Sequence, residues 1–458
     1  MKIAVAGASG FVGSHLIERL SKEGHQVIAL SRTKRSSQDP NMSWKKCDLF
    51  SRLDIISALQ GCDAAVYLVH SMLPSARLSQ GSFLDYDLVL ADNFARAAKQ
   101  IDLKHLIYVG GIIPEDMTLS PHLLSRLEVE RTLKASGLPF TSLRAGIILG
   151  PLSSSFRMMH ELVLKLPIMI CPSWTQTLSS PVFITDIIEA LVFCSGNEKT
   201  FNKSYDIGGK TTISYLDMMK VLARKLGKKR FFMAFPFFTP GLSKLWVSLI
   251  TGAPKDLVYP LIGSLKTHMV PNIHRSLDIP GTERKSFEAS IDAIVQQDTE
   301  LKNQPKAFQK KHKQARKEVR SIQRLETLYR FDAKEVARLY FQWLPTLYAP
   351  LIKVIEEEGT IRFLLCGMKQ PLLTLVYSDE VSTTEHQVYY IKKGFLTEGE
   401  GRGRLNFRSI IDLRYTMVEI HEFVPRLPWY IYKFTQAKWH LYVMRSFNRY
   451  LLSIQKDA

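Results

Sequence analysis

Through the first 150 residues, short apolar runs alternate with stretches in which apolar residues recur at helical spacing. The apolar runs cover residues 3–6, 27–30, 64–69, 106–109 and 141–143. Continuous apolar strands separated by amphipathic helices are typical of a parallel sheet with helices on both faces. The pattern therefore predicts an α/β fold with a doubly wound parallel sheet over the first 150 residues.

The pattern changes in the last third of the chain. A helical stretch near 332–343 precedes apolar–polar alternation at 361–365, 372–377, 387–391, 405–410 and 416–423. Alternation with period two predicts an antiparallel sheet, and a long helical pattern from Pro428 to Ile454 follows it. Residues 331–458 are therefore expected to form an α+β domain. The aromatic stripe of its last helix is more typical of a core than of a ligand pocket.

A glycine motif lies between the first apolar run and the first helical stretch. Its glycines are Gly7, Gly10 and Gly13. In a strand–turn–helix context this spacing is typical of a Rossmann dinucleotide-binding loop, in which the pyrophosphate lies at the helix N-terminus. The expected contacts are Gly7, Ser9, Gly10, Phe11, Val12 and Gly13. The alternative is an ordinary glycine-rich turn.

The second apolar run indicates which dinucleotide binds. NAD-binding proteins place a carboxylate about 20 residues beyond the glycines to bind the ribose. This chain has Ser31, Arg32, Thr33 and Arg35 there. A guanidinium pairs well with a 2′-phosphate, so NADP (NADPH) is favoured over NAD. Solvated loop charges are the alternative explanation.

Residues after the other strand ends complete the predicted cofactor site, because ligands of parallel sheets bind at the carboxyl ends of strands. Asp48 and Leu49 are expected near the adenine. Leu68, Val69 and His70 are expected near the nicotinamide and its ribose. Asn93 and Gly110 are the remaining predicted cofactor contacts.

Over residues 1–290 these features resemble the atypical, extended short-chain dehydrogenase/reductases, including predicted nucleoside-diphosphate-sugar epimerases. Beyond the glycine motif, the resemblance rests on segments 67–72, 143–146, 182–186 and 204–209, together with Asp48 and Asn93. It implies NAD(P) binding, oxidoreductase chemistry and a small substrate-binding portion over 150–290. A curved sheet gripping one long helix, as expected for 331–458, resembles the START-like fold by architecture. That resemblance implies an apolar ligand.

The catalytic pattern departs from this family, whose enzymes use a Tyr-x-x-x-Lys pair on a helix. Spacing aligns His122 and Arg126 with the tyrosine and the lysine. A histidine can donate a proton near neutral pH, so both are candidate catalytic residues, with His70 and Ser71 near the reacting centre. The alternative is that Ser120 caps this helix, Pro121 occupies its first turn, and His122 and Arg126 serve no catalytic role.

The composition of the chain indicates which classes of ligand and partner it is suited to bind. The 458 residues carry 61 Lys and Arg against 43 Asp and Glu, a net charge of +18, which suits a phosphorylated cofactor or anionic lipid. Residues 291–330 are expected to be a basic linker or helix. Because no aromatic platform accompanies its cations, nucleic-acid binding is not expected. No metal-ligand spacing is found, and five scattered cysteines favour a reducing compartment.

No segment is long and apolar enough to span a membrane. Residues 231–250 follow a basic stretch and are compatible with a surface helix on anionic lipid, although a buried substrate-domain helix is favoured.

Together, these features lead us to expect a cytoplasmic NADP(H)-dependent oxidoreductase. It would act on a carbonyl or enoyl group of an apolar or lipid-like small molecule, with peripheral contact to the inner face of the membrane left open. The alternative is a non-catalytic NADPH-binding regulatory or assembly module.

Overall fold

The computed structural model describes residues 1–70, 78–114, 119–151, 153–234, 247–248, 250–252, 254–296, 318–398, 403–411 and 413–456. The chain forms two compact units. The amino-terminal unit comprises Met1–Met72 and Leu90–Lys310, and the carboxy-terminal unit comprises Leu73–Val89 and Lys311–Ala458. A short segment of the first half of the chain thus belongs to the second unit.

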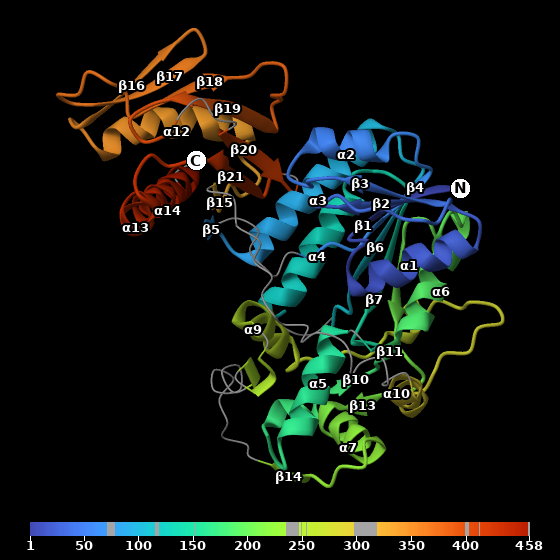
Figure 1. Cartoon of the computed structure of the whole chain (residues 1–458). Coiled ribbons are helices and arrows are strands. Elements are labelled where there is room, and N and C mark those ends of the chain that lie inside the picture. Colours follow the sequence, from blue (N-terminus) through green and yellow to red (C-terminus); the bar gives the residue numbers. More distant parts are fainter. Residues whose placement is uncertain are drawn as a thin grey trace. The chain divides into compact units, whose positions relative to one another are not determined.

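The amino-terminal unit is built on a parallel sheet of seven strands (Figure 1). In spatial order they are β12 (Lys203–Ile207), β7 (Phe140–Ala145), β6 (His105–Gly111), β4 (Ala64–Tyr67), β1 (Lys2–Ala6), β2 (Gln26–Ser31) and β3 (Met42–Lys46). Each of the five predicted apolar runs lies on one of these strands, extending two residues past the end of β4. The doubly wound fold is confirmed.

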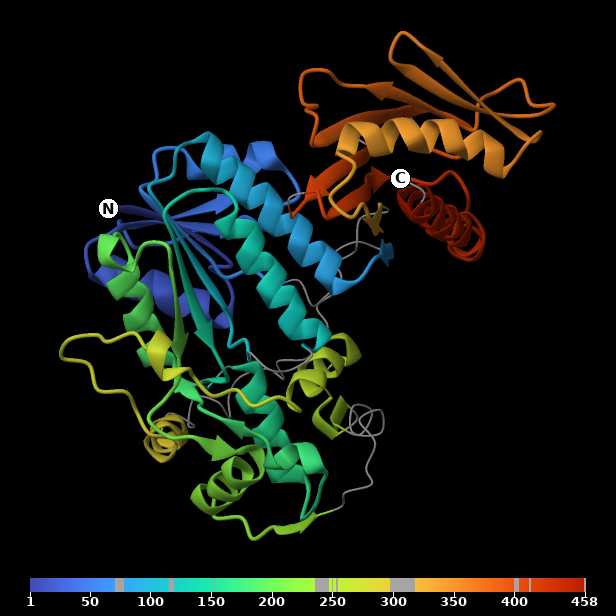
Figure 2. The same cartoon turned by 180° about the vertical axis from the view of Figure 1, so that it is seen from behind.

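Helices cover both faces of this sheet (Figure 2). Ile3 and Val5 pack with α1 (Phe11–Lys22) and α6 (Ile184–Cys194). Ala4 and Ala6 pack on the opposite side with α2 (Arg52–Leu59), α4 (Pro121–Lys134) and the part of α3 (Phe83–Gln100) from residue 90 on. Because successive strand residues point to opposite faces, an unbroken apolar strand is needed here.

The smaller portion of this unit follows β7. Its helices are α5 (Ser154–Lys165), α7 (Tyr215–Lys225), α9 (Lys255–Ser264) and α10 (Phe287–Gln296). Its short strands are β8 (Ile148–Leu149), β9 (Ile168–Cys171), β10 (Leu178–Ser179), β11 (Val182–Phe183), β13 (Ile213–Ser214) and β14 (Phe231–Ala234). The start of the predicted 231–250 helix is therefore a strand, and 235–246 and 249 lie outside the described residues.

The carboxy-terminal unit contains an eight-stranded sheet. In spatial order its strands are β16 (Ile352–Glu357), β17 (Thr360–Leu365), β18 (Leu373–Tyr377), β19 (His386–Lys393), β20 (Arg404–Ile410), β21 (Tyr415–Phe423), β15 (Val319–Glu326) and β5 (Leu78–Gln80). Neighbours are antiparallel except β15 and β5, which are parallel. The five predicted strands of this region are present.

Two expectations for this unit are corrected. Residues 319–326 fall in the predicted basic linker or helix but form β15, while 301–317 lie outside the described residues. The single helix predicted over 428–454 is divided into α13 (Trp429–Phe434) and α14 (Gln436–Lys456). The division falls at Thr435, whose φ of −116° and ψ of −90° interrupt the helix.

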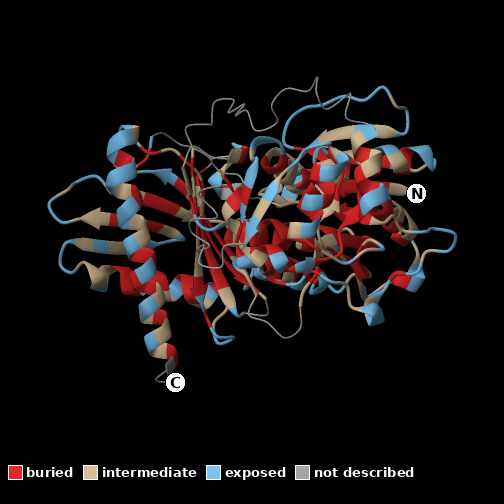
Figure 3. Ribbon diagram, turned by 90° about the horizontal axis from the view of Figure 1, so that it is seen from below, coloured by how far each residue is buried: buried red, intermediate tan, exposed pale blue. Residues whose placement is uncertain are grey.

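Aromatic side chains fill the core of this unit. Tyr340 and Phe341 of α12 (Ala333–Leu347) pack against Phe407 of β20 and Tyr389 of β19, and Tyr340 also contacts Phe447 of α14. Figure 3 shows buried and exposed positions around α14, the helix that ends near the label C. The aromatic stripe thus contributes to a packed core. The START-like resemblance stays a prediction.

Within the described part of the chain, no helix is both long and apolar enough to cross a membrane. All five cysteines are free thiols, four of them buried and Cys366 exposed.

Candidate functional site

The loop between β1 and α1 has the close packing that its glycines require. Gly7 has a φ of +87°, and a Cβ atom on it would lie 3.0 Å from the Leu68 carbonyl oxygen. A Cβ on Gly13 would lie 2.3 Å from the Gly7 carbonyl oxygen. Both positions therefore exclude larger residues. Among the described residues, a Cβ at Gly10 would meet only the Gly7 oxygen, at 3.2 Å, so the absence of a side chain there serves something other than internal packing.

The N-terminus of α1 fits an anionic ligand. Gly10 is its N-cap, and among the described residues no side chain caps it. Its fully described first turn contains no acidic residue. Uncapped N–H groups and the helix dipole favour a phosphate. Ser9 is exposed, Phe11 and Val12 are half-buried, and the Phe11 ring fills the space beside Gly150. These residues fit the pyrophosphate of a dinucleotide.

The predicted 2′-phosphate contacts lie at the carboxyl end of β2. The buried Ser31 hydroxyl accepts a hydrogen bond from the Thr33 amide at 3.3 Å and so shapes the turn. Arg32 and Thr33 are exposed. The Arg35 guanidinium lies 5.1 Å from the centre of the Trp44 ring. The turn thus presents one guanidinium to solvent and stacks another on an aromatic ring.

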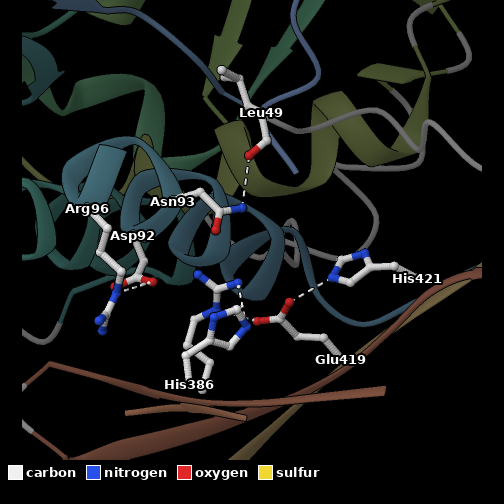
Figure 4. Close-up of polar contacts among 8 residues, drawn as sticks. Leu49, Asp92, Asn93, Arg96, His386, Glu419 and His421 are labelled. Carbon is white, nitrogen blue, oxygen red and sulfur yellow. Dashed lines mark hydrogen bonds and ion pairs between the residues drawn. The ribbon is translucent and has the colours of Figure 1, made fainter. Parts of the chain in front are cut away.

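Residues expected near the adenine hold their own loop together. Asp48 Oδ1 accepts a hydrogen bond from the Phe50 amide at 3.1 Å. Asn93 of α3 is buried, and its side-chain amide donates to the Leu49 carbonyl oxygen at 2.9 Å (Figure 4). In the structure Asn93 therefore supports the loop after β3.

The residues expected near the nicotinamide converge beyond the end of β4. The Leu68 amide donates to the Ala6 carbonyl oxygen at 2.9 Å. The Arg126 guanidinium, from α4, lies 3.5 Å from the Val69 carbonyl oxygen. The rings of His70 and His122 have centroids 5.2 Å apart. Three of the four candidate catalytic residues thus come together, and Ser71 lies outside the described residues.

The start of α4 combines a helix cap with a fixed histidine. Ser120 is the N-cap and accepts from the Leu123 amide at 3.3 Å, and Pro121 occupies the first turn. His122 Nδ1 lies 3.1 Å from Ser264 Oγ, which is 2.9 Å from Ser120 Oγ. Ser264 belongs to α9, which packs on α4. Ser264 could not be predicted as a partner of His122, because 142 residues separate the two in the chain.

The hydroxyls of Tyr108 and Tyr86 already have backbone partners, the carbonyl oxygens of Arg126 and Arg320. Tyr108 is fully buried, and its hydroxyl donates to the Arg126 carbonyl oxygen at 3.1 Å. The Tyr108 ring packs against Gly110, where an added Cβ atom would lie 2.7 Å from Cε1 of the ring. Tyr86 belongs to the carboxy-terminal unit, where burial raises its pKa to about 12.

A buried ion pair supports the edge of the sheet behind α4. Arg144 of β7 donates to both carboxylate oxygens of Glu130 of α4, at 2.9 and 2.7 Å. Ser204 of β12 donates to Glu130 at 3.0 Å. Burial alone would lower the pKa of Arg144, but the bonds to Glu130 raise it. Burial raises the pKa of the neighbouring Asp206 carboxyl. From the sequence, Arg144 stands out only as part of segment 143–146, which carries the family resemblance.

A cavity of about 240 Å³ lies elsewhere in this unit, lined by residues of α6, β12 and the loop before α10. Two of its charged residues, Asp186 and Arg284, have hydrogen-bond partners. Asp186 accepts from the Lys285 amide at 2.9 Å, and Arg284 donates to the carbonyl oxygens of Gly208 and Leu277 at 3.1 and 2.6 Å. None of the candidate cofactor residues lines it.

The carboxy-terminal unit has a buried ionic cluster of its own (Figure 4). Arg408 and His421 bind the two oxygens of Glu419 at 2.8 and 2.7 Å. Burial opposes ionisation of Glu419, but Arg408 outweighs it and keeps the pKa of the carboxyl below its usual range. Burial lowers the pKa of His421 to about 4. The cluster is thus one ion pair joined to a neutral imidazole. No group of His, Cys, Asp and Glu in the described residues could hold a metal ion.

A comparison with protein families found a match to the region that contains the glycine loop. Residues 7–160 match the NAD(P)H-binding family model. The amino-terminal unit has a Rossmann-like fold, and this part of it is similar to NAD(P)H-binding proteins. The match covers the glycine motif and both candidate histidines, and it does not choose between NAD and NADP.

Similar proteins agree on this fold. The auxiliary protein GraX of Staphylococcus aureus is 32% identical over 112 residues, which make up 24% of this chain and 36% of GraX. A nucleoside-diphosphate-sugar epimerase from Staphylococcus aureus superimposes with a TM-score of 0.52 at 16% identity, over 64% of this chain and 99% of that protein. The NADPH-dependent quinone oxidoreductase QOR2 of Escherichia coli superimposes with a TM-score of 0.52 at 17% sequence identity. The superposition covers 64% of this chain and 100% of that protein.

Proposed function

We propose that this protein is an NADP(H)-dependent oxidoreductase that reduces a carbonyl or enoyl group and uses a histidine in place of the tyrosine of related enzymes. One observation carries the proposal. His70 and His122, with ring centroids 5.2 Å apart, meet beside Arg126 beyond the end of β4. Parallel sheets bind ligands at this end.

The glycine loop and the N-terminus of α1 would hold the pyrophosphate, and Arg32 would bind the 2′-phosphate. When bound, the reduced nicotinamide supplies a hydride. His122 would give a proton from Nε2 to the substrate oxygen or carbon, because Ser264 holds the ring through Nδ1 at 3.1 Å. Arg126 would hold the ribose and fix the turn at Val69.

The substrate we propose is an apolar or lipid-like small molecule. The quinone oxidoreductase QOR2, which was solved with NADPH, has the same fold, so this architecture accommodates both NADPH and an apolar carbonyl substrate in that protein. We further propose that the protein works in the cytoplasm, where free thiols such as Cys366 stay reduced, and meets such substrates at the inner face of a membrane.

The test is NADPH consumption over a panel of quinones, aldehydes, ketones and enones. His122→Phe should lower turnover by about 10²- to 10⁴-fold, the contribution of a general acid, with little change in NADPH affinity. Ser264→Ala should lower turnover less and shift the pH profile, because it only positions the ring. His160→Phe, which changes a histidine of α5, is the matched control. Full activity in His122→Phe would contradict the proposal.

A second candidate is a non-catalytic NADPH-binding module. One feature favours it: α4 lacks the Tyr-x-x-x-Lys pair. GraX, which shares 32% identity over 112 residues, is named an auxiliary protein. Tight NADPH binding without turnover of any panel member, unchanged by His122→Phe, would support the module.

A further inference from the structure

Exposed aromatic side chains gather on the two last helices, where soluble proteins usually present polar residues. Tyr430 and Phe434 of α13 are 69% and 62% exposed, and Trp439 and Tyr442 of α14 are 44% and 52% exposed. We name these four residues the aromatic face. Tyr430 and Phe434 lie four residues apart on α13, and Trp439 and Tyr442 lie three residues apart on α14, so each pair shares one side of its own helix.

The aromatic face is distinct from the core-facing side of the same helices. Tyr432, Ala437, Met444 and Phe447 are buried in the core of the carboxy-terminal unit. The core therefore already has its own apolar stripe, and the aromatic face is a second one. A contiguous exposed apolar surface of this kind marks a contact with a partner or a membrane.

Cations are interleaved with these rings. The ammonium groups of Lys433 and Lys438 lie 5.6 and 5.3 Å from the centre of the Phe434 ring. Trp439 donates from its indole N–H to the Tyr348 hydroxyl, and the two rings meet edge to face at 5.4 Å. Two lysines thus lie against one ring of the aromatic face, and a hydrogen bond fixes Trp439.

The charge of this segment is one-sided. Residues 425–456 contain no aspartate or glutamate. Their cations are Arg426, Lys433, Lys438, Arg445, Arg449 and Lys456. A second copy of the chain seated on this face would bring two such sets together, and like charges across an interface are unfavourable. An anionic partner complements them.

We infer that the aromatic face of α13 and α14 binds the surface of an anionic phospholipid membrane. Tyrosine and tryptophan side chains are enriched at the headgroup level of membranes, and basic residues beside them attract anionic lipid. This surface differs from residues 231–250, which the sequence suggested. The inference supplies the contact surface for the membrane association in the proposed function, and it does not depend on hydride transfer.

The test is flotation of the full-length protein, without coenzyme, on vesicles of phosphatidylcholine alone or with a third of phosphatidylglycerol. Wild type should bind only the anionic vesicles, and raising the salt from about 0.1 M to about 1 M should weaken binding. Lys433→Ser/Lys438→Ser should lower the partition coefficient by about 30-fold, since each cation near such a surface strengthens binding about fivefold. Tyr430→Ser/Phe434→Ser should lower it at any salt concentration.

Matched controls change exposed residues elsewhere. Lys99→Ser/Lys369→Ser alters two exposed lysines, and Leu53→Ser/Ile273→Ser alters side chains that are 70% and 81% exposed. Both pairs should bind vesicles like wild type. Unchanged thermal unfolding and unchanged NADPH turnover with a water-soluble substrate would show that the helix variants fold and that the proposed chemistry is intact.

Three results would overturn the inference. One is wild-type protein that does not float with anionic vesicles. Another is equal binding by the helix variants and their controls, which would assign the contact to another surface such as the exposed Phe231 and Met233 of β14. The third is a dimer in sedimentation experiments that Tyr430→Ser/Phe434→Ser dissociates, which would assign the aromatic face to a second copy.

Discussion

Replacing Gly10 by alanine should separate cofactor binding from folding. In the structure a Cβ at this position meets only the Gly7 carbonyl oxygen, at 3.2 Å, and the backbone φ of −81° suits any residue. An alanine N-cap costs about 1 kcal/mol relative to better caps, while the stiffer unfolded chain returns about 0.4–1 kcal/mol. The free energy of unfolding of the coenzyme-free protein should therefore change little.

The affinity for NADPH should fall strongly if the pyrophosphate binds at the N-terminus of α1 as proposed, because the new methyl group would lie in its path. Forcing an extra methyl into a close contact costs about 1–3 kcal/mol, so the Kd for NADPH should rise by about 5- to 150-fold. Calorimetric titration of Gly10→Ala with NADPH measures this, with urea unfolding on the same samples.

Gly263→Ala is the matched control. Gly263 lies in α9, and a Cβ there meets no atom within 4 Å in the part of the chain that the structure describes. This variant should bind NADPH like wild type and unfold at slightly higher urea, because alanine is the better helix former. If Gly10→Ala and Gly263→Ala bind NADPH with the same affinity, the pyrophosphate does not lie on α1.

The remaining predictions concern charge and pH. Arg32→Ala should weaken the binding of NADPH by about 1.5–3 kcal/mol, the strength of a charge-assisted hydrogen bond, and leave the binding of NADH almost unchanged. Equal losses of affinity in titrations with both coenzymes would refute the 2′-phosphate contact. Glu130→Gln leaves Arg144, only 13% exposed, without its carboxylate, and should cost about 3–5 kcal/mol in urea unfolding; a loss below about 1 kcal/mol would contradict a tight buried pair. Burial lowers the pKa of His105 from 6.5 to about 4, and its Nδ1 already accepts from the Gly196 amide at 3.3 Å. The unfolded chain therefore takes up this proton first, and stability should fall between pH 6.5 and 4 by up to about 3 kcal/mol for this group; His105→Gln should flatten that slope by one proton, and an unchanged slope would speak against it.

The sheet of the amino-terminal unit could be predicted because its strands are buried on both faces and so appear as unbroken apolar runs. The eight-stranded sheet was predicted only in part. Strand β15 carries Arg320 and Arg324 within a basic stretch that resembled a solvated linker. Arg324 is only 18% exposed because it pairs with Asp85 at 2.9 Å, a residue 239 positions away. A partner that distant leaves no local signal.

The same limit applies to the candidate site. Position after a strand end identified His70, and spacing on a helix identified His122, but only the fold brings their rings together. Ser264, which holds His122, has an unremarkable sequence context. The break at Thr435 was missed because neither glycine nor proline marks it.

Calorimetric titration of the purified wild-type chain with NADPH and with NADH tests the central claim most directly. Binding of one coenzyme per chain, tighter for NADPH than for NADH, is the predicted result. Absence of binding heat with either coenzyme, at temperatures chosen so that a small enthalpy cannot hide binding, would contradict a nicotinamide nucleotide at the loop between β1 and α1.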